Sequence, residues 1–458
     1  MSTNPILSLA RAGATSRAWD AFVAAGLDRV EEVNALTLKG RLLKDRARQA
    51  AGAERMALFA QSGASYRRAA TLRPDSYPLI NAAAMALFAG DGATAAAIAR
   101  DVLTLVDGDP SQGETPYWRE ATRAEALLLL GQTDKAKSSL AAAIAGAPLA
   151  WEDHAVTLRQ FAAIHSVTNS DAAWLDPYRP APSLHFSGIL GLDPDDDIAT
   201  QAIRNAITEL SPGFGFGALA AGADIIAAEA LLAAGAELHA VLPSSPETFC
   251  QSSVAPFGSA WVERFHTLCA AAHSLTICNT GVPTNRAGIT LAEYQAMGMA
   301  ISKAQLLESR AIAIRIAPEE RPVLGDPWHA AGRPIVRVAV SESRPTAGLA
   351  PLDEGHLLFV VALADDAGLA DPMGFETLDE AVAAIPAEHP QAAIDCTITG
   401  HRDTAAALLR STHKDSIFAS KDAAMALLAA GQCSRAEPMG EMESTAGPID
   451  IYAIWLSR

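Results

Sequence analysis

The stretch GFGFGALAAGADIIAAEALLAAGAELHAVLP, residues 213–243, decides the fold that we expect for the centre of this chain. Glycines crowd its beginning, an alanine-rich run follows, and its last seven residues, ELHAVLP, have the composition of a buried strand. A strand, a glycine turn, a helix and a second strand form a βαβ unit with parallel strands. The glycine turn and the helix N-terminus of such a unit can hold a phosphate group.

Neighbouring segments continue this alternation of strands and helices. SLHFSG (183–188), SLTICN (274–279) and AIAIRIA (311–317) have the pattern of further strands, and helical runs separate them. We therefore predict a doubly wound parallel α/β domain over residues 171–330. Ligands of such domains bind beyond the carboxyl ends of the strands, where Ser187-Gly188, the glycine turn and Pro243 fall.

One familiar nucleotide motif fits the glycine turn imperfectly. Residues 215–220 match G-x-G-x-x-A, the dinucleotide fingerprint, but they open the second βα unit rather than the first. The strand that follows ends in Leu242-Pro243 instead of an acid that could hold a ribose. A redox enzyme that uses NAD is therefore only a minor possibility.

A different family fits better. The run 217–243 and the segment VAPFGSAWVERF (254–265) resemble the SLOG superfamily of Rossmann-like domains, and the resemblance spans residues 183–316. It implies a pocket for a nucleotide-derived ligand, lined or shaped by Ser187, Gly188, Gly215, Gly217, Gly222, Asp224 and Glu229. Asp224 could instead only cap its helix, and Glu229 could be a surface or interface acid. Ile189 stands where the family usually has His, which weakens a catalytic role for that loop.

Relatives of the SLOG type also include LOG enzymes, which split the bond between base and ribose phosphate with a PGGxGTxxE motif. The loop GVPTNRAGITLAEYQ (281–295) offers only Gly288, Thr290 and Glu293 at related places, and the paired glycines are missing. A LOG-like phosphoribohydrolase is therefore the alternative function, and a surface acid on an amphipathic helix explains Glu293 more simply.

Helical repeats fill the first third of the chain. The segments 76–106 and 115–148 each pair two helical runs across a glycine turn, which is the tetratricopeptide (TPR) pattern. LKGRLLKDRA (38–47) and YPLINAAAMALFAGD (77–91) resemble the TPR-type region of bacterial class III nucleotide cyclases, which is related to the TRAF-binding region of stress-activated kinase kinases. We predict a TPR-like solenoid over residues 1–170, which binds a protein partner or serves only as a structural cap.

The last third, residues 331–458, alternates strands and helices irregularly and predicts an α+β domain. We assign strands to PIVRVAV (334–340), HLLFVVALA (356–364) and three later segments. HLLFVVALA and the closing segment from 416 resemble class III cyclase domains, whose two metal ions need two carboxylates. Phe359, Val360 and Val361 stand where the first carboxylate is expected. The resemblance therefore implies a degenerate cyclase-like domain, and residual adenylate or guanylate cyclase activity ranks last.

Bulk composition narrows the functional classes. The 458 residues carry a net charge of −17, which argues against a broad nucleic-acid or membrane surface. Five cysteines without a CxxC pair indicate a reduced, cytoplasmic protein, and no apolar stretch predicts a membrane span. We expect a non-catalytic signalling scaffold without a metal site, which binds a nucleotide-type ligand and either binds a protein partner or forms a homodimer.

Overall fold

The chain divides into two compact units, Met1–Pro180 and Ala181–Arg458, which are described separately. The first unit is helical, and the second holds two β-sheets with their covering helices. The computed structural model describes residues 4–11, 15–278, 284–319, 326–341, 351–365, 368–388, 390–398, 402–412, 416–444 and 447–457.

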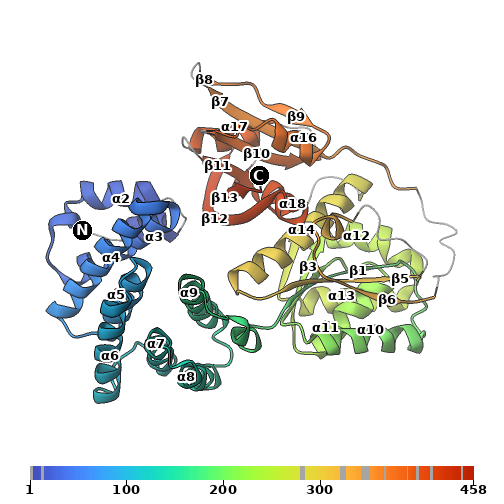
Figure 1. Cartoon of the computed structure of the whole chain (residues 1–458). Helices are drawn as coiled ribbons and strands as arrows, with labels where there is room; N and C mark the ends of the chain where they lie inside the picture. Colours follow the sequence, from blue (N-terminus) through green and yellow to red (C-terminus); the bar gives the residue numbers. More distant parts are fainter. Residues whose placement is uncertain are drawn as a thin grey trace. The chain divides into compact units, whose positions relative to one another are not determined.

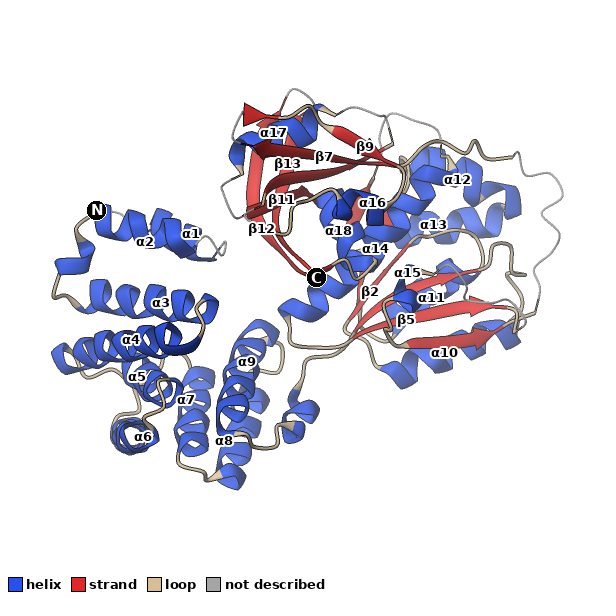
Figure 2. Cartoon of the chain, turned by 45° about the horizontal axis from the view of Figure 1, so that its top comes forward, coloured by secondary structure: helices blue, strands red, loops and turns tan. Residues whose placement is uncertain are grey.

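The N-terminal unit consists of antiparallel helix pairs packed side by side (Figure 2). This agrees with the predicted helical repeats. Its elements are α1 (Asn4–Arg11), α2 (Thr15–Ala24), η1 (Leu27–Arg29), α3 (Val33–Gln49), α4 (Gly52–Leu72), α5 (Ser76–Phe88), α6 (Gly92–Gly108), α7 (Pro116–Leu129), α8 (Thr133–Gly146), α9 (Trp151–Thr168) and η2 (Ala173–Tyr178).

Local sequence signals set the ends of the helices in the α7–α8 repeat. The Thr115 side chain accepts a hydrogen bond from the backbone N–H of Trp118, and Pro116 occupies the first turn, where its missing N–H costs nothing. Gly131 reverses the chain with a φ of 71°, a conformation that favours glycine. The two helices then bury small residues such as Ala136 and Ala143.

The segment 174–182, which follows the predicted solenoid, belongs partly to the helical unit. Its first half forms η2, and Leu175 is buried in the same apolar cluster as Leu158 and Phe161 of α9. The helical unit therefore extends past residue 170. Asp176 and Pro177 are typical of a turn in the sequence. In the structure, however, the neighbouring apolar side chains pack against α9 and complete the helical unit.

The second unit begins with a six-stranded parallel sheet in the order β4-β3-β2-β1-β5-β6 (Figure 1). This confirms the predicted parallel α/β architecture. Its strands are β1 (Ser183–Gly188), β2 (Phe214–Gly217), β3 (Glu237–Leu242), β4 (Ser274–Ile277), β5 (Ala311–Ala317) and β6 (Ile335–Ala339). Its helical segments are α10 (Asp197–Leu210), α11 (Ala223–Ala233), α12 (Pro246–Ser253), η3 (Ala255–Phe257), α13 (Ser259–Ala271), α14 (Arg286–Leu306) and α15 (Pro327–Ala330).

The sixth strand corrects one sequence assignment. We placed PIVRVAV in the C-terminal domain, but Ile335–Ala339 pairs in parallel with β5 and extends the first sheet. The parallel sheet therefore continues past residue 330. A short apolar run carries no information about which sheet it joins, because that choice depends on contacts distant in sequence.

Helices cover both faces of the parallel sheet. Leu184, Phe186 and their neighbours in register face α10, α11 and α13 and form a large apolar cluster. The other face, which carries His185 and Arg315, lies under α14 (Figure 1). This second face is unusually polar for a buried sheet surface, so its side chains need specific partners.

The second sheet is mixed, in the order β12-β13-β11-β10-β7-β8, and β9 also pairs with β7. Its β10–β11 pair is parallel, whereas its other pairs are antiparallel, as an α+β domain requires. Its elements are β7 (Leu358–Asp365), β8 (Gly368–Leu369), β9 (Met373–Phe375), α16 (Leu378–Ala383), β10 (Gln391–Thr397), α17 (Asp403–Ser411), β11 (Ser416–Ser420), α18 (Lys421–Ala429), β12 (Cys433–Ser444) and β13 (Gly447–Leu456).

Helices α14 and α18 pack together between the two sheets (Figure 1). Gly298 of α14 makes the closest approach, because a Cβ atom at this position would lie 2.4 Å from the carbonyl oxygen of Met425. Nearby, the amide nitrogen of Gln295 donates to Oδ1 of Asp422 over 2.8 Å. The two sheets are therefore joined by close helix packing and by a hydrogen bond to a carboxylate.

Candidate functional site

The topology of the parallel sheet favours a ligand site at the carboxyl ends of its strands. We call this side of the sheet the sheet edge. From β1 the chain first adds β2, β3 and β4 on one side, and then β5 and β6 on the other. The winding direction therefore changes between β1 and β5, and ligands of open α/β sheets bind beyond the carboxyl ends of the strands at such a switch point. Here Ser187 pairs with Arg315, and Gly188 pairs with Ile316.

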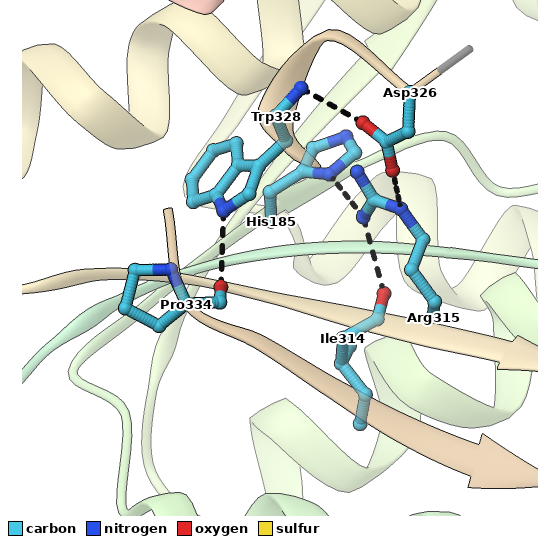
Figure 3. Close-up of polar contacts among 6 residues, drawn as sticks. All are labelled: His185, Ile314, Arg315, Asp326, Trp328 and Pro334. Atoms are coloured by element: carbon cyan, nitrogen blue, oxygen red, sulfur yellow. Dashed lines mark hydrogen bonds and ion pairs between the residues drawn. The ribbon is translucent and has the colours of Figure 1, made fainter. Parts of the chain in front are cut away.

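Arg315 is the central side chain at this edge (Figure 3). Its Nε donates to Oδ2 of Asp326 over 2.6 Å, and its Nη1 donates to Nδ1 of His185 over 2.8 Å. The side chains of Arg315 and Asp326 are each 11% exposed. Nη2 of Arg315 is buried and has no hydrogen-bond partner in the described protein. Nη1 also donates to the carbonyl of Ile314 over 3.3 Å, so three contacts fix the guanidinium while Nη2 remains unused.

His185 and Trp328 hold this arrangement in place (Figure 3). Burial and the positive charge of Arg315 keep the pKa of His185 well below its usual value, so the ring is neutral and can accept a hydrogen bond. Its ring stacks on Trp328 with a centroid separation of 5.8 Å, and the indole N–H donates to the carbonyl of Pro334. Asp326 also accepts from the backbone N–H of Trp328 and so caps α15.

Two further acids belong to the same electrostatic cluster. Asp224, near the start of α11, is 7% exposed and accepts a hydrogen bond from the backbone N–H of Gly188 over 2.9 Å. Burial raises its pKa to about 8, with a further upward contribution from Glu293 and an opposing one from Arg315. Desolvation also raises the pKa of Glu293 on α14, although that side chain keeps an exposed surface. Two carboxyl groups therefore share the neighbourhood of one guanidinium.

The glycines of the opening stretch have packing partners. A Cβ at Gly215 would lie 2.3 Å from Leu231, and one at Gly217 would lie 2.5 Å from the carbonyl oxygen of Phe186. A Cβ at Gly188 would lie 2.4 Å from the Cβ of Ala223. Close approach between strand, loop and helix explains why these positions carry glycine. A ligand contact for them stays a prediction.

The chain itself covers part of the expected phosphate cradle. Gly222 has a φ of 109° and forms a β-bridge with Leu190, and the backbone N–H of Ala223 donates to the carbonyl of Ile189. The loop after β1 therefore already uses an amide group at the start of α11. The charged side chains on the other face of the sheet are therefore better candidates for ligand contacts than the glycine turn.

The remaining predicted site residues lie at different places. Ser187 is next to Arg315 in the register of β1 and β5, so both side chains point to the face under α14. Pro243 follows β3 and lies near Gly288 on α14, where an added Cβ atom would be 3.7 Å from the Cβ of Pro243. Glu229 accepts hydrogen bonds from Nε and Nη2 of Arg264, both over 2.7 Å, and so joins α11 to α13.

The Glu229 contact leads to a first prediction. Glu229→Gln should lower the free energy of unfolding by about 1 kcal/mol, because it removes the charge from a two-pronged, partly exposed ion pair. It should leave ligand binding at the sheet edge unchanged. Chemical denaturation and calorimetry measure the two effects, and a loss of affinity without a loss of stability would instead make Glu229 a ligand contact.

Arg315, His185 and Asp326 were absent from the predicted site. The sequence did hold one signal, since Arg315 is the single charged residue in the otherwise apolar strand AIAIRIA. A cation at a buried strand position needs partners, which a search for charged residues inside strand patterns would have found. Asn279 and residues 281–283 of the LOG-like loop lie outside the described residues.

Comparisons with known proteins bear on the helical unit. A family model described as Tetratricopeptide Repeats-Sensor matches residues 3–86. No curated protein and no solved structure gives a significant match. The matched family supports a protein-interaction or sensor role for the helical repeats.

Two further findings on the described residues concern membrane spans and metal sites. None of the helices in the described ranges is long and apolar enough to cross a membrane. In the same part of the chain, no three His, Cys, Asp or Glu side chains are grouped so that they could hold a metal ion.

Proposed function

We propose that this chain is a cytoplasmic, non-catalytic sensor and scaffold. Its TPR-like helices bind a protein partner, and its SLOG-like parallel sheet binds a nucleotide-derived ligand at the carboxyl ends of β1 and β5. The observation that carries the proposal is the buried Nη2 of Arg315 at the switch point of the sheet, which has no hydrogen-bond partner among the described residues.

An unpartnered buried donor is costly, typically by about 1–3 kcal/mol. A ligand that supplies an acceptor atom removes this cost. Asp326 and the neutral ring of His185 already hold the guanidinium in position. Phosphate oxygens and base carbonyls are both good acceptors for arginine. Nucleotide-type compounds offer both, which is why we propose this ligand class.

The non-catalytic part of the proposal concerns the mixed sheet. Phe359, Val360 and Val361 lie buried on β7, in the strand that resembles the first catalytic strand of class III cyclases. Apolar side chains cannot bind the two metal ions on which that chemistry depends. We therefore propose that this degenerate cyclase-like domain serves interaction rather than turnover.

One observation favours a second function. Asp224 and Glu293 both have raised pKa values beside Arg315, and acids with perturbed pKa values at a ligand site are candidates for proton transfer. The alternative is therefore a nucleotide hydrolase that releases a free base. Incubation with nucleotides, followed by chromatography for free bases, distinguishes the two functions. Release that Glu293→Gln abolishes would favour the enzyme.

The direct test is binding of a nucleotide panel to the full chain, measured by thermal shift and then by calorimetry. We expect a ligand of this class to bind, and Arg315→Met to weaken it about 10- to 100-fold through loss of a charge-assisted hydrogen bond. Arg264→Met is the matched control, because Arg264 pairs with Glu229 away from the edge, and it should bind normally. Failure of the whole panel would contradict ligand sensing.

A further inference from the structure

Helix α3 of the helical unit is strongly basic, whereas the chain as a whole is acidic. Helix α3 has five basic residues and one acidic residue, although the whole chain has a net charge of −17. Two of the five cations are occupied locally. Lys39 donates to the carbonyl of Asp28, and Arg46 stacks over the ring of Trp19.

The other three cations, Arg41, Lys44 and Arg48, are spaced by three and four residues along α3. This spacing places them on one face of the helix. Asp45 lies within 3.8 Å of Arg41 and within 3.6 Å of Arg48, so one carboxylate serves two guanidinium groups. Among the side chains of α3 itself, this face therefore carries three cations and one carboxylate.

This face belongs to the inner layer of the helical unit. Lys44 of α3 donates to Oδ1 of Asn81 on α5, and Gln160 of α9 donates to Glu125 on α7. The helices α5, α7 and α9 also contact one another directly, whereas α4, α6 and α8 are their hairpin partners. Helices α3, α5, α7 and α9 thus form one continuous surface. Helix α5 adds no charged residue to this surface.

Lys44 is the residue whose charge is least well compensated. Its amine donates to a neutral amide, and burial, followed by the charge of Arg48, lowers its pKa to about 8. On α7, burial raises the pKa of Glu125 to about 7, which reduces its negative charge near neutral pH. Asp45 and Glu125 offset this charge only in part, and Lys44 forms no ion pair with a described carboxylate, so an acidic guest would be stabilised here.

An aromatic side chain lies beside the cations. Tyr77 of α5 is 52% exposed, and Asn81 donates a hydrogen bond to its carbonyl one turn later. The Tyr77 ring packs edge-on against the buried Tyr66 of α4. An exposed, rigidly held tyrosine next to basic side chains suits a peptide that carries both carboxylates and apolar groups.

We propose that the inner face of α3 and α5 binds an acidic peptide segment of a partner protein, whose carboxylates pair with Arg41, Lys44 and Arg48. This inference rests on the proposed scaffold function and gives the chemistry of its protein partner. Charge complementarity selects the partner, because acidic side chains meet the basic face of α3, whereas basic segments would be repelled.

The test uses the full chain and a fluorescein-labelled ten-residue peptide of alternating Glu and Ala, with a Gln-and-Ala peptide as the neutral match. Fluorescence anisotropy should show binding of the Glu peptide only, and added salt should weaken it. Lys44→Met should weaken binding about tenfold or more, since it removes the most desolvated cation. Lys135→Met, on the exposed side of α8, is the matched control and should have no effect.

Measurements of stability and of nucleotide binding distinguish failure of the peptide proposal from misfolding and from failure of the nucleotide proposal. Lys44→Met should fold at least as stably as the wild type, because an apolar side chain replaces a poorly compensated buried charge. Arg315→Met should bind the Glu peptide normally, and Lys44→Met should bind the nucleotide-type ligand normally. Equal affinity for the Glu and Gln peptides, or unchanged binding by a folded Lys44→Met variant, would overturn the proposal even if nucleotide binding is confirmed.

Discussion

Gly298→Ala is expected to destabilise the second unit by about 2 kcal/mol or more, although alanine is the better helix former. A single added methyl group at this position would lie 2.4 Å from the carbonyl oxygen and 2.5 Å from the Cα of Met425. These atoms belong to the backbone of α18 and cannot rotate away. Helices α14 and α18 would have to separate, which would also stretch the hydrogen bond between Gln295 and Asp422.

Chemical denaturation gives the free energy of unfolding, and hydrogen exchange of α14 and α18 locates the change. Gly108→Ala is the matched control, because this residue ends α6 and a Cβ there would meet nothing within 4 Å. It should be neutral or stabilising by up to about 1 kcal/mol. A Gly298→Ala variant as stable as the wild type would show that the two helices do not approach so closely.

Asp224→Asn is expected to become more stable than the wild type as the pH rises. In the folded protein Asp224 keeps its proton up to a pKa of about 8, whereas the unfolded chain releases it near the ordinary aspartate value. The folded state therefore binds more protons between these limits, and the wild type loses about 1.4 kcal/mol per pH unit from this group. Asparagine has no such dependence.

The amide of this variant keeps an oxygen that can accept from the backbone N–H of Gly188, so the loop after β1 should stay in place. Denaturation curves at several pH values from about 5 to about 9.5 measure the difference between the two proteins. We expect the gap to widen up to about pH 8 and then to level off. A gap that does not change with pH would mean that Asp224 is already ionised in the folded protein.

Periodicity and turn chemistry were sufficient to predict much of the fold. Alternating strand and helix patterns identified the β1, β2, β3 and β5 segments, and the caps and glycine turns marked the helix pairs. These signals are local, because a strand or cap depends on residues within one turn or one pleat. The sheet that receives Ile335–Ala339 is not a local property, and that assignment was wrong.

The candidate site was harder to predict for a related reason. Glycines attract attention as phosphate binders, but Gly215 and Gly217 also fit places where a side chain has no room. Sequence spacing cannot distinguish the two uses of glycine. The contact between Arg315 and His185 joins residues of β1 and β5 that are 130 positions apart, and only the register of the sheet brings them together.

In the proposed complex, the ligand supplies a hydrogen-bond acceptor to Nη2 of Arg315 at the switch point of the parallel sheet. The most direct measurement is a crystal structure of the full chain with the nucleotide-type compound that gives the largest thermal shift. The proposal predicts ligand density beyond the ends of β1 and β5, with an oxygen or nitrogen within hydrogen-bond distance of Nη2 of Arg315. A ligand bound elsewhere, while Nη2 contacts only water, would contradict it.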